Sequence, residues 1–421
     1  MILRLLTEVS TYIFFANDYR LISTRISYET GASKLGYNTG LLNVPKIYVL
    51  TLVASHNNLF AKEARMNKYI GFDIDCNKTV ACVVESGKND LYQTIGSDVQ
   101  SMRQFLISQK QPGCKIHLAF EISGQAGFIY DELIDCADEI KIVNPTKMTW
   151  IYRTAKKNDR IDARKMAVLM SINELPTVYM PNKEVRQWRE TILHRKKIID
   201  RFVQVKNRIR ATFKAHGFNR PENKGSWWRR SNRRWMKSIC EQNIGLSDLW
   251  YMQLNNLLDE LALLDIQLRR ITDYLDGYLS NKAGGKLLRS IPGVGPRTAE
   301  AILAYTDDVS RFGSYKEYCS YFGLTPKLDE SGCCRRVGHI SKHGPSVVRW
   351  VLCESSWKVI RYSGALKGFY ERVMGGQTGR KKIAIVAVCR KLLSIMRAML
   401  LSGELFNEEL VNKVDDLIEA V

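Results

Sequence analysis

Long apolar runs and CxxC cysteine pairs are missing from this sequence of 421 residues, in which only Cys333 and Cys334 are adjacent cysteines. No stretch approaches the ~20 apolar residues of a membrane span, so we expect no membrane partner. The ten cysteines include no CxxC pair, and the six histidines do not cluster with them. Neither a zinc site with ordinary ligand spacing nor a disulfide framework is visible, which suits a reducing cytoplasm.

The first 65 residues also lack a clear hydrophobic period. The start, MILRLLTEVSTYIFF, carries Arg4 and Glu8 and has no small-residue cleavage site, so it is not a signal peptide. A strong pattern begins only with MNKYIGFDID at Met66. We expect Met66 to be the natural start and 1–65 to be an over-extended reading frame; the alternative is a genuine accessory segment.

Acidic residues are few relative to basic ones. The chain has 43 Asp and Glu against 63 Lys and Arg, a net charge of +20, which points to a nucleic-acid partner. Between residues 186 and 235 there are 16 basic residues and three acids. Aromatic residues interleave with this charge, and such a mixture is typical of a nucleic-acid surface, although it does not separate RNA from DNA. The binding candidates there are Arg208, Arg210, Trp227, Trp228, Arg229 and Arg230.

Alternating short apolar segments predict an α/β domain over 66–183. Three strand-like segments joined by turns come first, and strands then alternate with helices. This order favours a mixed sheet with helices on its faces, as in α/β nuclease folds. The expected strands are KYIGFDID, TVACVVES, LYQTIGS, KIHLAFEIS and EIKIVNP, and the expected helices are 98–110, GFIYDELIDC and RIDARKMAVLMSI.

The rest of the chain reads as helical. In the segment 184–285, leucines step by three and four from Leu254 to Leu275, which predicts a coiled coil, either within the chain or between two copies. The segment 286–421 is mainly α. In LLRSIPGVGPRTAEAIL, Gly293 and Gly295 permit a tight turn like a helix-hairpin-helix, whose second helix presents amides to a phosphate. An ordinary helix–helix turn is the alternative.

Four carboxylates carry the predicted chemistry. Asp73 and Glu121 sit at the ends of apolar strands, where an acid is costly unless it is paired or bound to a metal. Asp159 and Asp162, within the basic run KKNDRIDARK, are three residues apart on one helix face. Hard oxygen ligands of this kind suit one or two Mg²⁺ ions, with Mn²⁺ as a substitute, in phosphodiester chemistry. Asp75 is a nearby alternative to Asp73.

The segments YIGFDID, LAFEISG and KKNDRIDARKMA resemble the DEDD signature of the "IS one-ten" group of insertion-sequence transposases. IPGVGPRTAEAILAYT, the stretch from FGSYKEYCSYFGLTP to VVRWVL, and KKIAIVAVCRKLL match later parts of the same family. The resemblance covers about 67–400. It implies a RuvC-like (RNase H fold) domain, a helical coiled-coil segment and a C-terminal transposase domain.

The resemblance also implies roles for individual residues. Asp73, Glu121, Asp159 and Asp162 match the family's metal-binding carboxylates. Ser331 matches its nucleophilic serine, which forms a phosphoserine link with DNA and needs a metal or base beside it. Many relatives have a second serine where this chain has Glu330, and Ser341 is the reserve candidate. The cations expected to neutralise the phosphate are Arg335, Arg336 and Lys342.

The implied partners are donor DNA, target DNA and a structured guide RNA from the element's non-coding end. RNA is held by shape, phosphate contacts and stacking, which the segment 186–235 could supply. We expect a homo-oligomer, a dimer or tetramer, because exchange between two duplexes requires several active subunits. The expected location is the bacterial cytoplasm, at the nucleoid. The rivals are a metal-dependent junction-resolving nuclease without a covalent step and a non-enzymatic nucleic-acid-binding protein.

Overall fold

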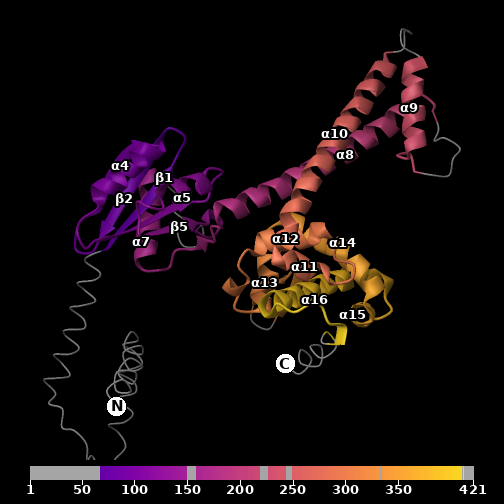
Figure 1. Cartoon of the computed structure of the whole chain (residues 1–421). Helices are drawn as coiled ribbons and strands as arrows, with labels where there is room; N and C mark the ends of the chain where they lie inside the picture. The colour runs from indigo at the N-terminus through magenta and orange to yellow at the C-terminus, as the bar shows by residue number, and fades with distance from the viewer. Residues whose placement is uncertain are drawn as a thin grey trace, which may run out of the picture.

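The computed structural model of the chain has three parts: a mixed α/β sheet domain, a helical stalk and a helical body (Figure 1). Residues 1–65, Lys156 and Lys157, for which the sequence also gave predictions, lie outside the described residues. The described residues are 67–148, 158–218, 226–242, 249–331, 334–409 and 411.

A six-stranded sheet forms the centre of the first domain, in the order β3-β2-β1-β4-β5-β6. β1, β2 and β3 form an antiparallel meander, β4 and β5 continue parallel to β1, and β6 is an antiparallel edge. The long strands and helices agree with the segments expected from the sequence, whereas β6 was not expected. The strands are β1 (Asn67–Ile74), β2 (Lys78–Glu85), β3 (Leu91–Gly96), β4 (Lys115–Glu121), β5 (Glu139–Val143) and β6 (Thr177–Val178).

Helices cover both faces of this sheet. α4 (Val99–Gln109) and α5 (Ala126–Leu133) pack on one face, where the core contains Ile70, Phe72 and Phe120. The short helix α6 (Pro145–Met148) follows β5. α7 (Asp159–Ser171) packs on the other face, against Ala119 and Val143. Alternate residues of β1 and β4 therefore face different helices, as the two-residue period of a strand requires.

The stalk is a helical hairpin of α8 (Lys183–Ala215) and α10 (Trp250–Ser280), with α9 (Arg230–Gln242) beside it (Figure 1). The leucine seam of α10 is buried against α8 and α9 of the same chain. The intramolecular reading of the heptad pattern is therefore correct. The expectation that this seam offers a surface for assembly is wrong, because its own hairpin already covers it.

The aromatic side chains of the basic segment belong largely to the core of the hairpin. Phe213 is fully buried, stacks on Trp235 with ring centroids 5.3 Å apart, and meets Trp227 at 5.7 Å. Trp227 and Trp228 are only half-buried but pack against the same core. These rings close the end of the stalk, where apolar burial stabilises them, and nucleic-acid binding by Trp227 and Trp228 stays a prediction.

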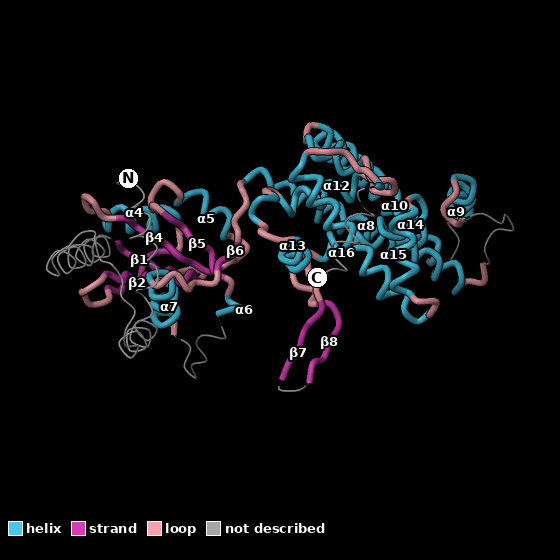
Figure 2. Tube along the Cα trace, turned by 90° about the horizontal axis from the view of Figure 1, so that it is seen from below, coloured by secondary structure: helices cyan, strands magenta, loops and turns pink. Residues whose placement is uncertain are grey.

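The helical body packs around one large core. A two-stranded hairpin, which the sequence analysis missed, projects from the helical body (Figure 2). Its strands are β7 (Pro326–Ser331) and β8 (Cys334–Ile340). The helices of the body are α11 (Ala283–Arg289), α12 (Pro296–Thr306), α13 (Tyr315–Tyr321), α14 (Ser346–Tyr362), α15 (Gly364–Met374) and α16 (Lys381–Ser402), with short 3-10 turns at Val309–Arg311 and Thr378–Arg380.

The GxG turn joins α11 to α12. Gly293 has φ +93°, and a Cβ there would lie 2.8 Å from the backbone nitrogen of Val359 in α14. Gly295 has an ordinary φ of −91° and open space where a Cβ would be. Only Gly293 therefore needs to be glycine, and its direct reason is close packing against α14.

Candidate active site

Asp73 and Glu121 end two neighbouring parallel strands. Phe72 of β1 is paired with Phe120 of β4, so the next residue of each strand lies at the same edge of the sheet. Phe72 and Phe120 face the α4–α5 core, and alternation turns the following residues toward the face that α7 covers. Asp73 is half-buried and Glu121 is exposed. The strand register therefore brings these two carboxylates to one edge.

α7 adds the other two carboxylates at that edge. A Cβ on Gly71 would lie only 2.0 Å from the carbonyl oxygen of Ala163, so this glycine lets α7 approach β1 very closely. Tyr69, earlier in β1, packs with the later α7 residues. α7 consequently runs opposite to β1, and its first turn, with Asp159 and Asp162, lies toward the end where Asp73 is.

Local capping explains why α7 begins where it does. The side chain of Asn158 accepts a hydrogen bond from the backbone N–H of Arg160 at 3.0 Å. Acids in the first turn are favoured by the helix dipole. Arg164 binds Asp90 at 2.5 Å, which raises the pKa of its guanidinium, and Arg160 lies over the ring of Tyr92. These two arginines of the run KKNDRIDARK are thus held against the β2–β3 edge.

Lysines neutralise the helix carboxylates. Lys78, at the start of β2, binds Asp159 at 3.1 Å, and Lys165 binds Asp162 at 3.1 Å. The second pair is the more enclosed, since the side chains of Asp162 and Lys165 are 24% and 12% exposed. Asp73 and Glu121 also have interaction partners. Lys165 could be anticipated from its i, i+3 spacing, whereas Lys78 comes from another strand and left no sequence signal.

The donor set fits a hard divalent cation, because all four groups are carboxylates. Within the described residues no three acidic, histidine or cysteine side chains are arranged as a formed metal site. Asp159 and Asp162 each form an ion pair with a lysine instead. Such pairing is favoured because neighbouring carboxylates repel each other. An ion bound here would therefore replace Lys78 and Lys165 as the neutralising charge.

Asp75 lies outside this arrangement. It is exposed in the turn between β1 and β2, where its N–H donates to the carbonyl oxygen of Lys78 at 3.1 Å. The strand ends at Ile74, so the alternation that would place Asp75 beside Asp73 no longer applies. The structure thus gives Asp75 a turn position.

Ser331 is the last residue of β7 and is paired with Cys334 across the hairpin. Glu330 is paired with Arg335, and Asp329 with Arg336. Lys342 follows β8 in a left-handed conformation, φ +57°, and is exposed. Ser341 is half-buried, and its N–H donates to Thr325. Within one chain the hairpin stands apart from α7, so the acids and Ser331 are not brought together (Figure 2).

The remaining nucleic-acid candidates lie on the stalk and at the GxG turn. Arg208, Arg210, Arg229 and Arg230 are exposed, which leaves their charges available to a polyanion. Among the described helices, none is long and apolar enough to span a membrane.

Two family models match the chain. Residues 70–217 match a transposase model of the DEDD type of IS110, and residues 285–371 match "Transposase IS116/IS110/IS902 family". The first covers nearly all of the α/β domain, with its four acids, and the whole of α8; the second covers the GxG turn and the β7–β8 hairpin. Both parts that carry the predicted chemistry therefore have counterparts in known transposases.

Three similar proteins match this chain over nearly the whole of their own length. A transposase for insertion sequence element IS1111A from Coxiella burnetii is 22% identical, over 83% of this chain and 94% of its own. A pilin gene-inverting protein from Moraxella bovis is 24% identical, over 81% and 98%. A transposase for insertion sequence element IS1328 from Yersinia enterocolitica is 24% identical, over 80% and 98%. Together with the two family models, these likenesses establish that the chain belongs to the IS110 family of DNA transposases and recombinases.

Proposed function

We propose that the chain cuts and rejoins DNA with divalent ions, Mg²⁺ in the cell, held by Asp73, Glu121, Asp159 and Asp162 on a RuvC-like (RNase H fold) domain. The observation that supports this is the placement of the four acids toward one edge of the sheet: two end adjacent parallel strands, and two open the helix packed over them. When bound, such ions activate an attacking oxygen and stabilise the leaving one. Lys78 and Lys165 pair with two of the acids until then.

The attacking group in this proposal is Ser331. Its hydroxyl loses a proton as the Oγ–P bond forms, and one P–O bond to a sugar breaks. The sugar oxygen takes up a proton and leaves as a hydroxyl, and a hydroxyl from another strand later displaces the serine in the same way. Arg335, Arg336 and Lys342 would offset the charge of the pentacoordinate phosphate. Because the hairpin and the acids lie apart in one chain, we propose that they meet between copies of an oligomer.

A trapped protein–DNA adduct tests the serine. We expect the parent protein to give a covalent adduct with cleaved DNA, and Ser331→Ala to abolish it, while Ser341→Ala retains it. Cleavage without any adduct in the parent, unaffected by Ser331→Ala, would instead indicate a junction-resolving nuclease.

Substitution of the helix acids tests the metal site. Asp162→Asn should lower strand cleavage a hundredfold or more, because removing a carboxylate ligand costs several kcal/mol of transition-state stabilisation. Asp75→Asn removes the same charge in the nearby turn and should leave cleavage within about threefold. The measurement is single-turnover cleavage as a function of Mg²⁺ and Mn²⁺. Equal rates for both variants would refute the assignment of Asp162.

We further propose that a structured RNA guides the chain and binds the stalk through its exposed arginines Arg208, Arg210, Arg229 and Arg230. Phosphate contacts of this kind hold folded RNA by shape. Sequencing of the RNA that co-purifies with the protein tests this. We expect one discrete species from the flank of the element, and bulk ribosomal fragments would contradict the proposal.

A further inference from the structure

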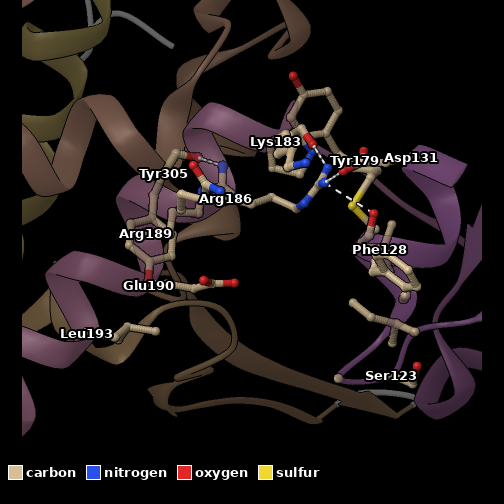
Figure 3. A pocket seen from close by; sticks show the side chains of 18 of the residues that line it. Ser123, Phe128, Asp131, Tyr179, Lys183, Arg186, Arg189, Glu190, Leu193 and Tyr305 are labelled. Atoms are coloured by element: carbon tan, nitrogen blue, oxygen red, sulfur yellow. Dashed lines mark hydrogen bonds and ion pairs between the residues drawn. The ribbon is translucent and has the colours of Figure 1, made fainter.

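A cleft of about 540 Å³ opens directly after Glu121. Ile122, the next residue, lines it together with the loop that leads into α5. The first turns of α8 form the opposite wall, and Tyr305 and Tyr321 of the helical body also contribute. Figure 3 shows Glu190 and Leu193 on one side, facing Phe128 and Ser123 across open space. The cleft therefore begins one residue beyond Glu121, on the α5 side of the sheet edge where the four acids lie.

The arginines of this cleft are occupied by the protein. Arg186 binds Asp131 and the carbonyl oxygens of Pro181 and Gly127 (Figure 3). Arg189 donates to the carbonyl oxygens of Ala304 and Tyr305 and lies over the Tyr305 ring at 5.0 Å. These contacts hold the cleft open and leave little cationic charge for a phosphate chain.

The walls of the cleft are instead apolar and aromatic. Four large apolar side chains that line it are unusually exposed: Ile122 45%, Phe128 59%, Tyr179 43% and Leu193 41%. Such a cluster of exposed apolar groups is costly in water and marks a binding site. Its volume lies in the range of small-ligand pockets, about 300–1,000 Å³. A flat, uncharged group fits these walls.

Two polar side chains at the rim of the cleft, Glu190 and Lys183, can orient a bound ligand. Within the described part of the chain, the carboxylate of Glu190 has no hydrogen bond or ion pair, and Figure 3 shows it extending toward Phe128. A carboxylate accepts hydrogen bonds from the amino group of a base. Lys183, exposed at the start of α8, lines the same cleft and can meet a phosphate.

We infer that this cleft binds one unpaired nucleotide of the DNA strand being processed, beside the scissile phosphate. The base stacks on Phe128, its amino edge faces Glu190, and Lys183 contacts its phosphate. The inference rests on the proposed function, since it is the adjacency to Glu121 that places the nucleotide beside the reacting phosphate. A base with an amino group is favoured over thymine, which has none.

Binding in the absence of metal tests the inference separately from catalysis. The probe is a short single-stranded DNA with 2-aminopurine at its centre, added to the full-length protein in a chelator. Competitors carry adenine, thymine or an abasic site at that position. We expect adenine to compete about tenfold better than the abasic site, because only a strand with a base can stack on the aromatic ring. Phe128→Leu should remove this advantage.

Glu190→Gln should reduce the preference for adenine over thymine, since an amide can pair with either base. Ile134→Ala, an exposed apolar change at the other end of α5, and Glu404→Gln, an equal charge change far along the chain, should preserve both preferences. An 8-azidoadenine at the centre should crosslink to 122–132 or 179–193.

Equal competition by abasic and adenine strands, or crosslinks elsewhere, would overturn the inference. Asp162→Asn should leave these binding results unchanged while it abolishes cleavage. If the binding preferences fail but Asp162→Asn still abolishes cleavage, the cleft has been misassigned. If the binding preferences hold but Asp162→Asn still cleaves, the metal site has been misassigned.

Discussion

The buried carboxyl group of Glu300 illustrates what a single residue contributes. It lies in α12 with its side chain 2% exposed, 2.9 Å from Arg297, which also binds Asp276 of α10. Burial raises the pKa of Glu300 to about 7, although Arg297 and Arg195 oppose that shift. The junction between stalk and body therefore contains an acid that titrates near neutral pH.

Glu300 makes the stability of this junction depend on pH. Its pKa in the folded protein exceeds the value of 4.5 of an ordinary glutamate, so unfolding releases a proton between pH 4.5 and 7. The free energy of unfolding should consequently fall as the pH rises through this window, by up to about 3 kcal/mol. Glu300→Gln should flatten the dependence. Amide hydrogen exchange of α12, corrected for intrinsic rates, measures how the free energy of unfolding depends on pH. Glu404→Gln is the control. If Glu300→Gln has the same pH dependence as this control and the parent protein, the prediction is contradicted.

The candidate site also shows which of its residues the sequence could predict. Asp73, Glu121, Asp159 and Asp162 were identified from strand ends and helix spacing, because local periodicity encodes both. Their lysine partners were not all predictable. Lys165 is one helical turn from Asp162, but Lys78 reaches Asp159 from another element. Pairing across elements depends on packing, which a one-dimensional pattern does not contain.

At the scale of elements, the GxG turn provides a matched pair of substitutions. Gly293→Ala should destabilise the body by about 2 kcal/mol or more, because φ is +93° and the new Cβ would meet the α14 backbone. Gly295→Ala should cost less than about 1 kcal/mol, since its φ is ordinary and its Cβ would enter open space. Denaturant unfolding compares them. Similar losses for both would mean that α14 does not press on this turn as the structure indicates.

The end of the stalk offers a second test. Phe213 is fully buried among Phe218, Trp227 and Trp235. Phe213→Ala should destabilise the hairpin by about 3–5 kcal/mol, the usual result of removing a buried aromatic ring. Val203→Ala, on the exposed side of α8, is the control and should have little effect.

Limited proteolysis of the segment 205–260 reports this local stability. Faster cleavage in Phe213→Ala but not in Val203→Ala is expected. If proteolysis is unchanged and only nucleic-acid binding falls, Phe213 acts as a stacking ring after all.

The sequence predicted some helices and strands correctly and missed others. The long strands and helices of the α/β domain follow simple periods, as does α10 with its leucine seam. The β7–β8 hairpin was missed, because PKLDES and CRRVGHI are polar and lack the alternation of a half-buried strand. It projects from the body, so no apolar face marks it in the sequence (Figure 2).

For the whole molecule, the separation of the hairpin from the acids leads to a complementation test. Neither Ser331→Ala nor Asp162→Asn should recombine DNA alone. A mixture of the two proteins should recover part of the activity, because one copy supplies the acids and the other the serine. Recombination assays on equimolar mixtures measure this. Recovery should be absent when both changes are in the same chain, and an inactive mixture would argue that each site forms within one copy.

The sequence by itself determined the family, the α/β-then-helical order, and the positions of the four acids at strand ends and on one helix face, because these depend on residue type and local spacing. Only the tertiary structure decided which groups meet. It assigned the leucine seam and the tryptophans to the stalk's own core, paired Lys78 with Asp159, and separated Ser331 from α7. Hydrophobic burial and ion pairing act between segments distant in the chain, so their partners are selected only when the elements pack.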